Sequence, residues 1–163
     1  MSLIELDISI WCQPHRLSHG WGHVVEIGDH LDGDLPGGVF QSMRYAKRDR
    51  GMPEVDRDYP HERFSVSPEA FAALARELDD ISYSFAEHPF TPMLGGGIYG
   101  LGVSRGRDRF ELSWHGLFQD QDDQIKNVYR SVERLAGLPA TTVGWRTGVY
   151  PGQFPPKDRE EPL

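Results

Sequence analysis

The chain has 163 residues, of which 38% are hydrophobic and 26% are charged, and its formal net charge at pH 7 is -8. This length predicts one domain, and the apolar content is enough for a two-layer core, which excludes wholesale disorder. No apolar run approaches the roughly 20 residues of a membrane span, so no membrane partner is expected. The acidic balance opposes nucleic-acid binding, which requires a basic surface.

Cysteine usage and the first residues predict a cytoplasmic protein. Cys12 is the only cysteine, so no internal disulfide is possible and a reducing compartment is expected. Residues 1–10 contain no basic residue and do not resemble a secretory signal. We expect residues 1–150 to form a single α+β domain. Residues 151–163, with four prolines and five charged residues, are expected to form a disordered C-terminal tail.

Alternating apolar and polar residues predict strands in the first third of the chain. The segment from Ile4 to Cys12 has the period of two that a half-buried strand requires, and it places Trp11 on the opposite side from the apolar stripe. The same alternation recurs from Trp21 to Ile27. Residues 39–46 and 63–66 predict two further strands, the second one short.

Two segments between these strands predict loops. Residues 28–38 contain four glycines and a proline, which are turn-forming residues. Residues 47–60 are charged, contain two prolines and show little periodicity, so an exposed loop is expected there.

Helix signals bracket residues 67–81 and 122–136. Ser67 can cap the free amides of the first helix, and Pro68 has no N–H to lose at its first position. Acidic residues crowd the start of the second helix, and Gly137 suits the left-handed conformation that ends a helix. Both segments carry an apolar stripe at helical spacing.

Between the helices, the segment from Tyr99 to His115 predicts a β-hairpin that turns at Gly106. Phe110, Leu112 and Trp114 form its apolar face, and glycines leave part of the other face bare. The order of elements predicts an α+β fold, an antiparallel β-sheet with two amphipathic helices packed on one face. A side chain, a ligand or a partner backbone is expected over Gly100 and Gly102.

Histidines near the start of the chain raise the question of a metal site. The residues Cys12, His15, His19 and His23 are all zinc-type ligands. Their spacing matches no recognised zinc motif, and Pro14 and Gly20 disfavour the helix that would align two of them. We therefore expect no metal and no cofactor. The alternative is that these residues belong to a metal-binding domain or to a small histidine-using enzyme.

Other motif-like patterns fail on their context. The run from Gly95 to Gly100 fits G-x-G-x-x-G but precedes a strand rather than a helix, so it predicts no dinucleotide site. Ser113 and His115 share a strand face with Glu111, but residues two apart on a strand are about 7 Å apart, too far for a catalytic hydrogen bond.

The hairpin sequence from Tyr99 to Val103 and from Phe110 to Gly116, followed by a helix ending at Gly137, resembles the closing half of small acidic bacterial proteins of the toxin-immunity type. The resemblance carries no diagnostic residue, so no functional residue is transferred. It implies a non-enzymatic protein that binds another protein, and the net charge favours a basic partner. A small-ligand-binding domain that uses the glycine face is the remaining alternative. Candidate partner contacts are Trp11, His15, Glu111, Ser113 and His115.

Overall fold

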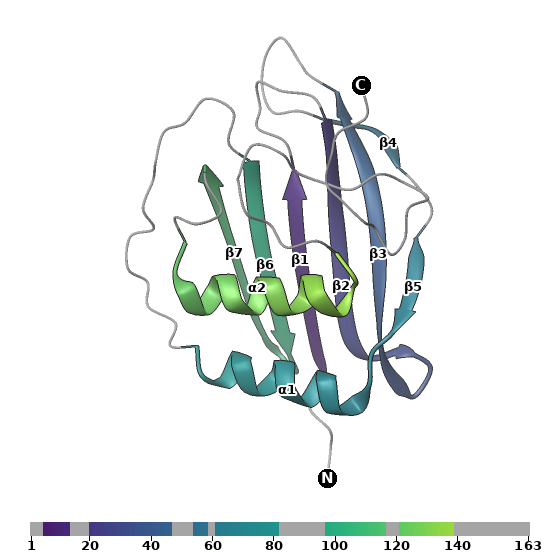
Figure 1. The fold of residues 1–163 in the computed structure, drawn as a ribbon, viewed down its shortest axis with the longest axis vertical. Coiled ribbons are helices and arrows are strands. Elements are labelled where there is room, and N and C mark those ends of the chain that lie inside the picture. The colour runs from purple at the N-terminus through teal and green to yellow at the C-terminus, as the bar shows by residue number, and fades with distance from the viewer. Residues whose placement is uncertain are drawn as a thin grey trace.

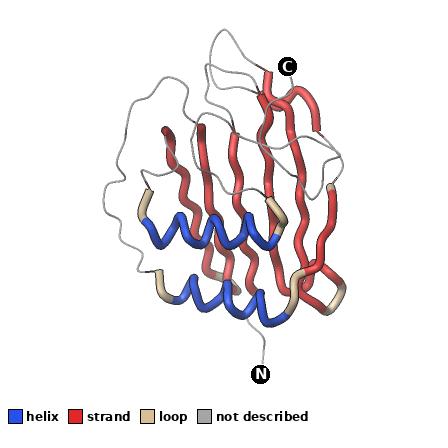
Figure 2. Tube along the Cα trace, in the orientation of Figure 1, coloured by secondary structure: helices blue, strands red, loops and turns tan. Residues whose placement is uncertain are grey.

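The computed structural model describes residues 5–13, 20–46, 54–58, 61–81, 97–116 and 121–138. Within these ranges the chain forms seven strands and two helices (Figures 1 and 2). They are β1 (Leu6–Gln13), β2 (Gly20–Asp32), β3 (Leu35–Ala46), β4 (Glu54–Asp58), β5 (Glu62–Ser65), α1 (Pro68–Asp79), β6 (Gly97–Arg105), β7 (Asp108–Gly116) and α2 (Asp123–Leu135).

The strands form one antiparallel sheet in the order β4-β3-β2-β1-β6-β7, and β5 also pairs with β3. This confirms the α+β class that was predicted from the sequence. The strand β1 lies in the middle of the sheet, with Asp7 opposite Gly28 of β2 and Leu6 opposite Arg105 of β6. Figure 1 shows the result as two groups of strands, β2 to β5 and β6 with β7, that meet on β1.

The predicted loop at residues 28–38 is wrong, because both neighbouring strands continue into it. The strand β2 extends to Asp32 and β3 begins at Leu35, so the turn is confined to the residues between them, where Gly33 has a φ of 68°. Two of the glycines that suggested a loop are instead strand residues covered by side chains from other strands. The Asp7 carboxylate lies over Gly28, and the Phe64 ring lies over Gly38.

The predicted exposed loop at residues 47–60 is also wrong in part. It contains β4, which pairs with the end of β3 through Arg44 and Arg57. The edge of β3 supplies the backbone partners that this charged segment needs to become a strand, and such a partner is invisible in local sequence. The short strand predicted at residues 63–66 is confirmed as β5, shifted by one residue.

Both predicted helices are confirmed, and their caps explain their boundaries. Ser67 Oγ accepts a hydrogen bond from the Ala70 amide at 3.1 Å, with Pro68 as the first helical residue of α1. The Asp122 carboxylate accepts one from the Gln124 amide at 2.9 Å at the start of α2.

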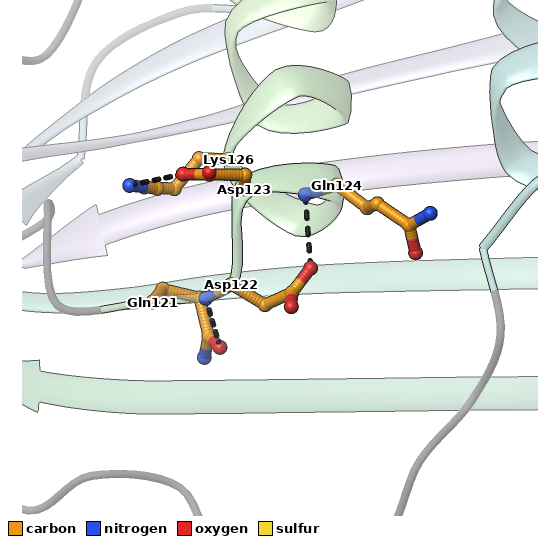
Figure 3. Close-up of polar contacts among 5 residues, drawn as sticks. All are labelled: Gln121, Asp122, Asp123, Gln124 and Lys126. Atoms are coloured by element: carbon orange, nitrogen blue, oxygen red, sulfur yellow. Dashed lines mark hydrogen bonds and ion pairs between the residues drawn. The ribbon is translucent and has the colours of Figure 1, made fainter.

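The start of α2 carries further polar contacts (Figure 3). Gln121 Oε1 accepts a hydrogen bond from the Asp122 amide at 2.8 Å, so the capping residue is itself held. Lys126 Nζ lies 2.9 Å from Asp123 Oδ1, and this hydrogen-bonded ion pair lowers the pKa of the Asp123 carboxyl. Gly137, with a φ of 70°, follows the last turn of α2, as the sequence predicted.

The predicted hairpin is confirmed as β6 and β7, with Gly106 at the turn and a φ of 60° there. Its inward face is also as predicted, because Leu112 and Trp114 are buried. The Tyr99 and Trp114 rings, on adjacent strands, lie 5.6 Å apart between centroids.

The core joins the sheet to both helices. Its cluster includes Leu74 and Leu78 of α1, and Val128, Tyr129 and Val132 of α2, together with the inward residues of β1 and β6. The Tyr129 ring meets the Trp114 ring edge-on at a centroid distance of 5.8 Å. Its hydroxyl donates a hydrogen bond to the backbone carbonyl of Trp11 at 3.1 Å, which ties α2 to the central strand.

The two helices are also linked to each other and to the hairpin. Ser131 Oγ of α2 donates to the Glu77 carboxylate of α1, 2.8 Å from Oε2. Arg105 at the end of β6 pairs with Asp79 of α1. In the described part of the chain, neither helix is long and apolar enough to cross a membrane. The tail predicted at residues 151–163 lies outside the described residues.

Candidate functional site

The face of the sheet opposite the core presents the most distinctive set of side chains. Successive strand residues point to opposite faces, so the pairing register places the partners of Trp11 on this second face. We call it the Trp11 face. Its central members are Asp7, Ser9 and Trp11 of β1, Val24 and Glu26 of β2, Val39 of β3, Gly100 and Gly102 of β6, and Glu111 and Ser113 of β7.

The Trp11 side chain packs on the glycines of β6. Trp11 and Gly100 are direct partners across β1 and β6. A Cβ atom on Gly100 would overlap Cε2 and Cζ2 of the indole, so the ring lies against the glycine backbone. At Gly102, a Cβ atom would lie 2.7 Å from Ser9 Oγ and 3.6 Å from Trp11 Cζ3. Of the three occupants expected over these glycines, a side chain of the protein itself is the one found.

Comparisons with protein-family models and with curated proteins found no match.

The indole is partly buried, with one side of the ring against β6. Val24, which pairs with Trp11 on the other side, is also partly buried, as is Val39 of the next strand. The middle of the face is therefore apolar and incompletely covered. The indole has little rotational freedom, because the sheet holds one of its sides.

Carboxylates surround this apolar centre. Glu26 lies opposite Ser9 and is exposed, and Glu111 lies opposite Gly102 and is exposed. The Glu111 carboxylate has a cation nearby, because Arg109 Nη2 lies 3.3 Å from its Oε2. The face thus combines a fixed aromatic ring with an acidic border.

Asp7, at one end of the face, is electrostatically unusual. Burial raises the pKa of the Asp7 carboxyl, and the neighbouring carboxylates of Asp29 and Glu5 raise the pKa further. His30 acts in the opposite direction but does not outweigh them. The Asp7 carboxylate is therefore a negative charge in surroundings that disfavour it.

The structure brings three of the five sequence-predicted contact residues onto one face. Glu111 and Ser113 of β7 lie opposite Gly102 and Gly100, which puts them one strand beyond the Trp11 seat. His15 lies outside the described residues, as does the side chain of His115. Sequence reasoning missed Val24 and Glu26, although the alternation it recognised from Trp21 to Ile27 already placed these two residues on one side.

The alternative metal set is brought together only in part. Cys12 and His23 are direct partners across β1 and β2, and Cys12 Sγ lies 3.3 Å from His23 Nδ1. Both side chains face the core, with exposed fractions of 1% for Cys12 and 0% for His23. His15 and His19 are outside the described residues, and among those described no group of three possible ligands occurs. The contact is a thiol–imidazole pair closed off from solvent.

Proposed function

We propose that the chain is a cytoplasmic, non-enzymatic protein-binding domain whose Trp11 face contacts a basic protein partner. In this arrangement the two helices pack on one face of the sheet and leave the Trp11 face for the partner. Support for the packing comes from the core cluster, which takes residues from α1, α2 and the inward side of the sheet. Figure 1 draws both helices across the same side of the sheet.

The observation that carries the proposal is the seating of Trp11 on Gly100. Tryptophan is enriched among the residues that dominate binding energy, because it buries a large area with few rotatable bonds. The ordering cost of binding is reduced further when the side chain is already held. Glycine at position 100 makes this possible, since any larger residue would overlap the ring.

The acidic border determines which partners fit. Glu26 and Glu111 lie on the same face as the indole, and the whole chain carries a formal net charge of -8. Complementary charge mainly accelerates association, while specificity and most of the affinity come from the buried anchor. A partner with a basic surface and a pocket for an indole ring is the best match.

Toxin neutralisation is the specific form of this proposal. It draws support from the resemblance of residues 99–137 to immunity proteins, and from the acidity of the face. A neutralising protein must bind and block, and it needs no catalytic group of its own. A toxin gene beside the gene for this chain in the source genome would agree with this form.

The experiment first finds the partner and then tests the face. A photo-crosslinking amino acid placed at Val24, on the Trp11 face, is compared with one at Glu69, an exposed position on α1. The full-length chain is crosslinked in the source cells, and the protein captured only from position 24 is purified.

Binding of that protein is then measured by calorimetry with two matched charge reversals. We expect Glu26→Lys to weaken binding about tenfold and Glu69→Lys to change it by less than about twofold, because only the former adds a cation to the interface. Equal effects of the two reversals, or crosslinks from position 69 alone, would contradict the proposal.

A further inference from the structure

A depression of about 380 Å³ opens on the Trp11 face. It lies where β1, β2 and β6 meet the start of β7. The side chains that matter for its chemistry are Asp7, Ser9, Glu26, Leu31, Ser104 and Arg109. All but Leu31 come from strand positions on the Trp11 face, as the pairing of Asp7 with Ser104 and of Ser104 with Arg109 shows.

The depression is lined by groups that accept hydrogen bonds. Asp7 and Glu26 contribute carboxylates from adjacent strands, and Ser9 and Ser104 contribute hydroxyls. Arg109 is the one cationic side chain among these lining residues, and Glu111 already pairs with it at 3.3 Å. No cationic side chain of the lining therefore pairs with the Asp7 or Glu26 carboxylate.

Leu31 adds an apolar side chain to the lining of the depression. The Leu31 side chain and the Asp7 carboxylate share the space over Gly28, so the carboxylate has an apolar neighbour. The edge of the indole comes close to Gly102, which forms part of the floor. Carboxylates on two adjacent strands beside an apolar side chain favour a planar, delocalised cation on a flexible apolar stem.

We propose that this depression is the binding site for an arginine side chain presented by the basic partner. The inference rests on the proposed function, and it adds the chemical identity of the group that enters. The guanidinium would donate to the Asp7 and Glu26 carboxylates, whose charges come from two strands and are spread around it. The aliphatic stem would pass along Leu31 toward the edge of the Trp11 ring.

The site is tested with a small probe, so that the test does not depend on finding the partner. N-acetyl-L-arginine amide is titrated into the isotopically labelled full-length chain, and backbone amide shifts are followed by NMR. N-acetyl-L-citrulline amide, which is neutral and has nearly the same shape, is the matched control. We expect saturable shifts at Ser9, Glu26 and Gly102 for arginine, with a Kd of roughly 1 mM, as suits a single side chain.

Variants then test whether the Asp7 and Glu26 carboxylates bind the guanidinium. We expect Glu26→Gln to weaken arginine binding about threefold, Asp7→Asn to do the same, and the double variant to weaken it roughly tenfold. The control Glu69→Gln on α1 should leave the Kd unchanged. Added salt should weaken binding as well, because the attraction is between partly exposed charges.

Two results would overturn the inference. One is equal shifts with the citrulline compound, and the other is a Kd unaffected in the double variant. The outcome is separable from that of the proposed function. A crosslinked partner that depends on Glu26, in a chain that does not bind arginine, would remove the arginine site and keep the binding face. Arginine binding in a chain whose partner does not use this face would remove the function and keep the site.

Discussion

The glycine beneath Trp11 can be tested by adding a single methyl group. In Gly100→Ala the new Cβ would overlap two atoms of the indole, so the ring must leave its seat or the strands must move apart. Backbone conformation is not the obstacle. The described glycines with positive φ are Gly33, Gly106 and Gly137, and Gly100 is not among them.

Two opposing effects set the size and sign of the change. Alanine is more favourable than glycine within a strand by about 0.5–1 kcal/mol. Overpacking by one methyl group costs about 1–3 kcal/mol, and here the neighbour is a large, partly buried ring. We therefore expect Gly100→Ala to lower the free energy of unfolding by about 1–2 kcal/mol.

The assay is urea unfolding followed by far-UV circular dichroism, which does not depend on the tryptophan being altered. Gly102→Ala is the matched control, because its Cβ would meet a serine hydroxyl that can rotate away. The key measurement is Gly100→Ala in a Trp11→Ala background, where the methyl group has room. There we expect a gain of about 0.5–1 kcal/mol, so the two sites should be coupled by roughly 2 kcal/mol.

The sign of the effect decides the matter. If Gly100→Ala stabilises the chain while Trp11 is present, the indole does not lie on Gly100. If the two substitutions are additive, there is no contact between the residues. Either result would also weaken the proposed function, which depends on a pre-positioned ring.

Two further predictions concern stability. Leu112 is 8% exposed on the inward side of β7, so we expect Leu112→Ala to lower the free energy of unfolding by about 2–5 kcal/mol in the same urea assay, and a loss below about 0.5 kcal/mol would place it outside the core. At Asp7, burial and the Asp29 and Glu5 carboxylates raise the pKa in the folded chain, so the folded state holds its proton more tightly than the unfolded state and loses stability as pH rises through the folded pKa. Asp7→Asn should therefore be more stable than the parent chain at neutral pH, and the difference should vanish below about pH 3, where the Asp7 carboxyl is protonated in both the folded and the unfolded state. An equal difference in Tm at both pH values would show that ionisation is not the cause.

The local sequence predicted the elements in which apolar residues recur at a regular spacing. The strand β1, the hairpin of β6 and β7, and both helices carry an apolar stripe at the right spacing, and Ser67 and Asp122 mark the helix starts. The region from Gly28 to Gly38 misled because glycine has no side chain to alternate. Its strand character comes from Asp7 and Phe64, which cover two of these glycines from other strands.

In the candidate site too, the local pattern predicted some features, and others depend on pairing between distant strands. Alternation placed Trp11 opposite the apolar stripe, and Glu111 and Ser113 on the polar side of the hairpin. What it could not provide was the register between β1 and β6, which brings residue 11 to residue 100. The bare glycine face and the unexplained tryptophan were both visible in the sequence. Their fit to each other depends on a pairing between distant segments.

The central place of β1 has a consequence for how the chain is made. Its partner β2 follows soon after it, but its other partner, β6, is separated from it by four strands and a helix. At a synthesis rate of roughly 5–20 residues per second, β1 waits several seconds or more before Arg105 can meet Leu6. During that time the nascent sheet has an open edge in what will become its middle, where it is open to pairing with other chains. A ribosome-bound chain ending before β6 should therefore be the stage most dependent on chaperones.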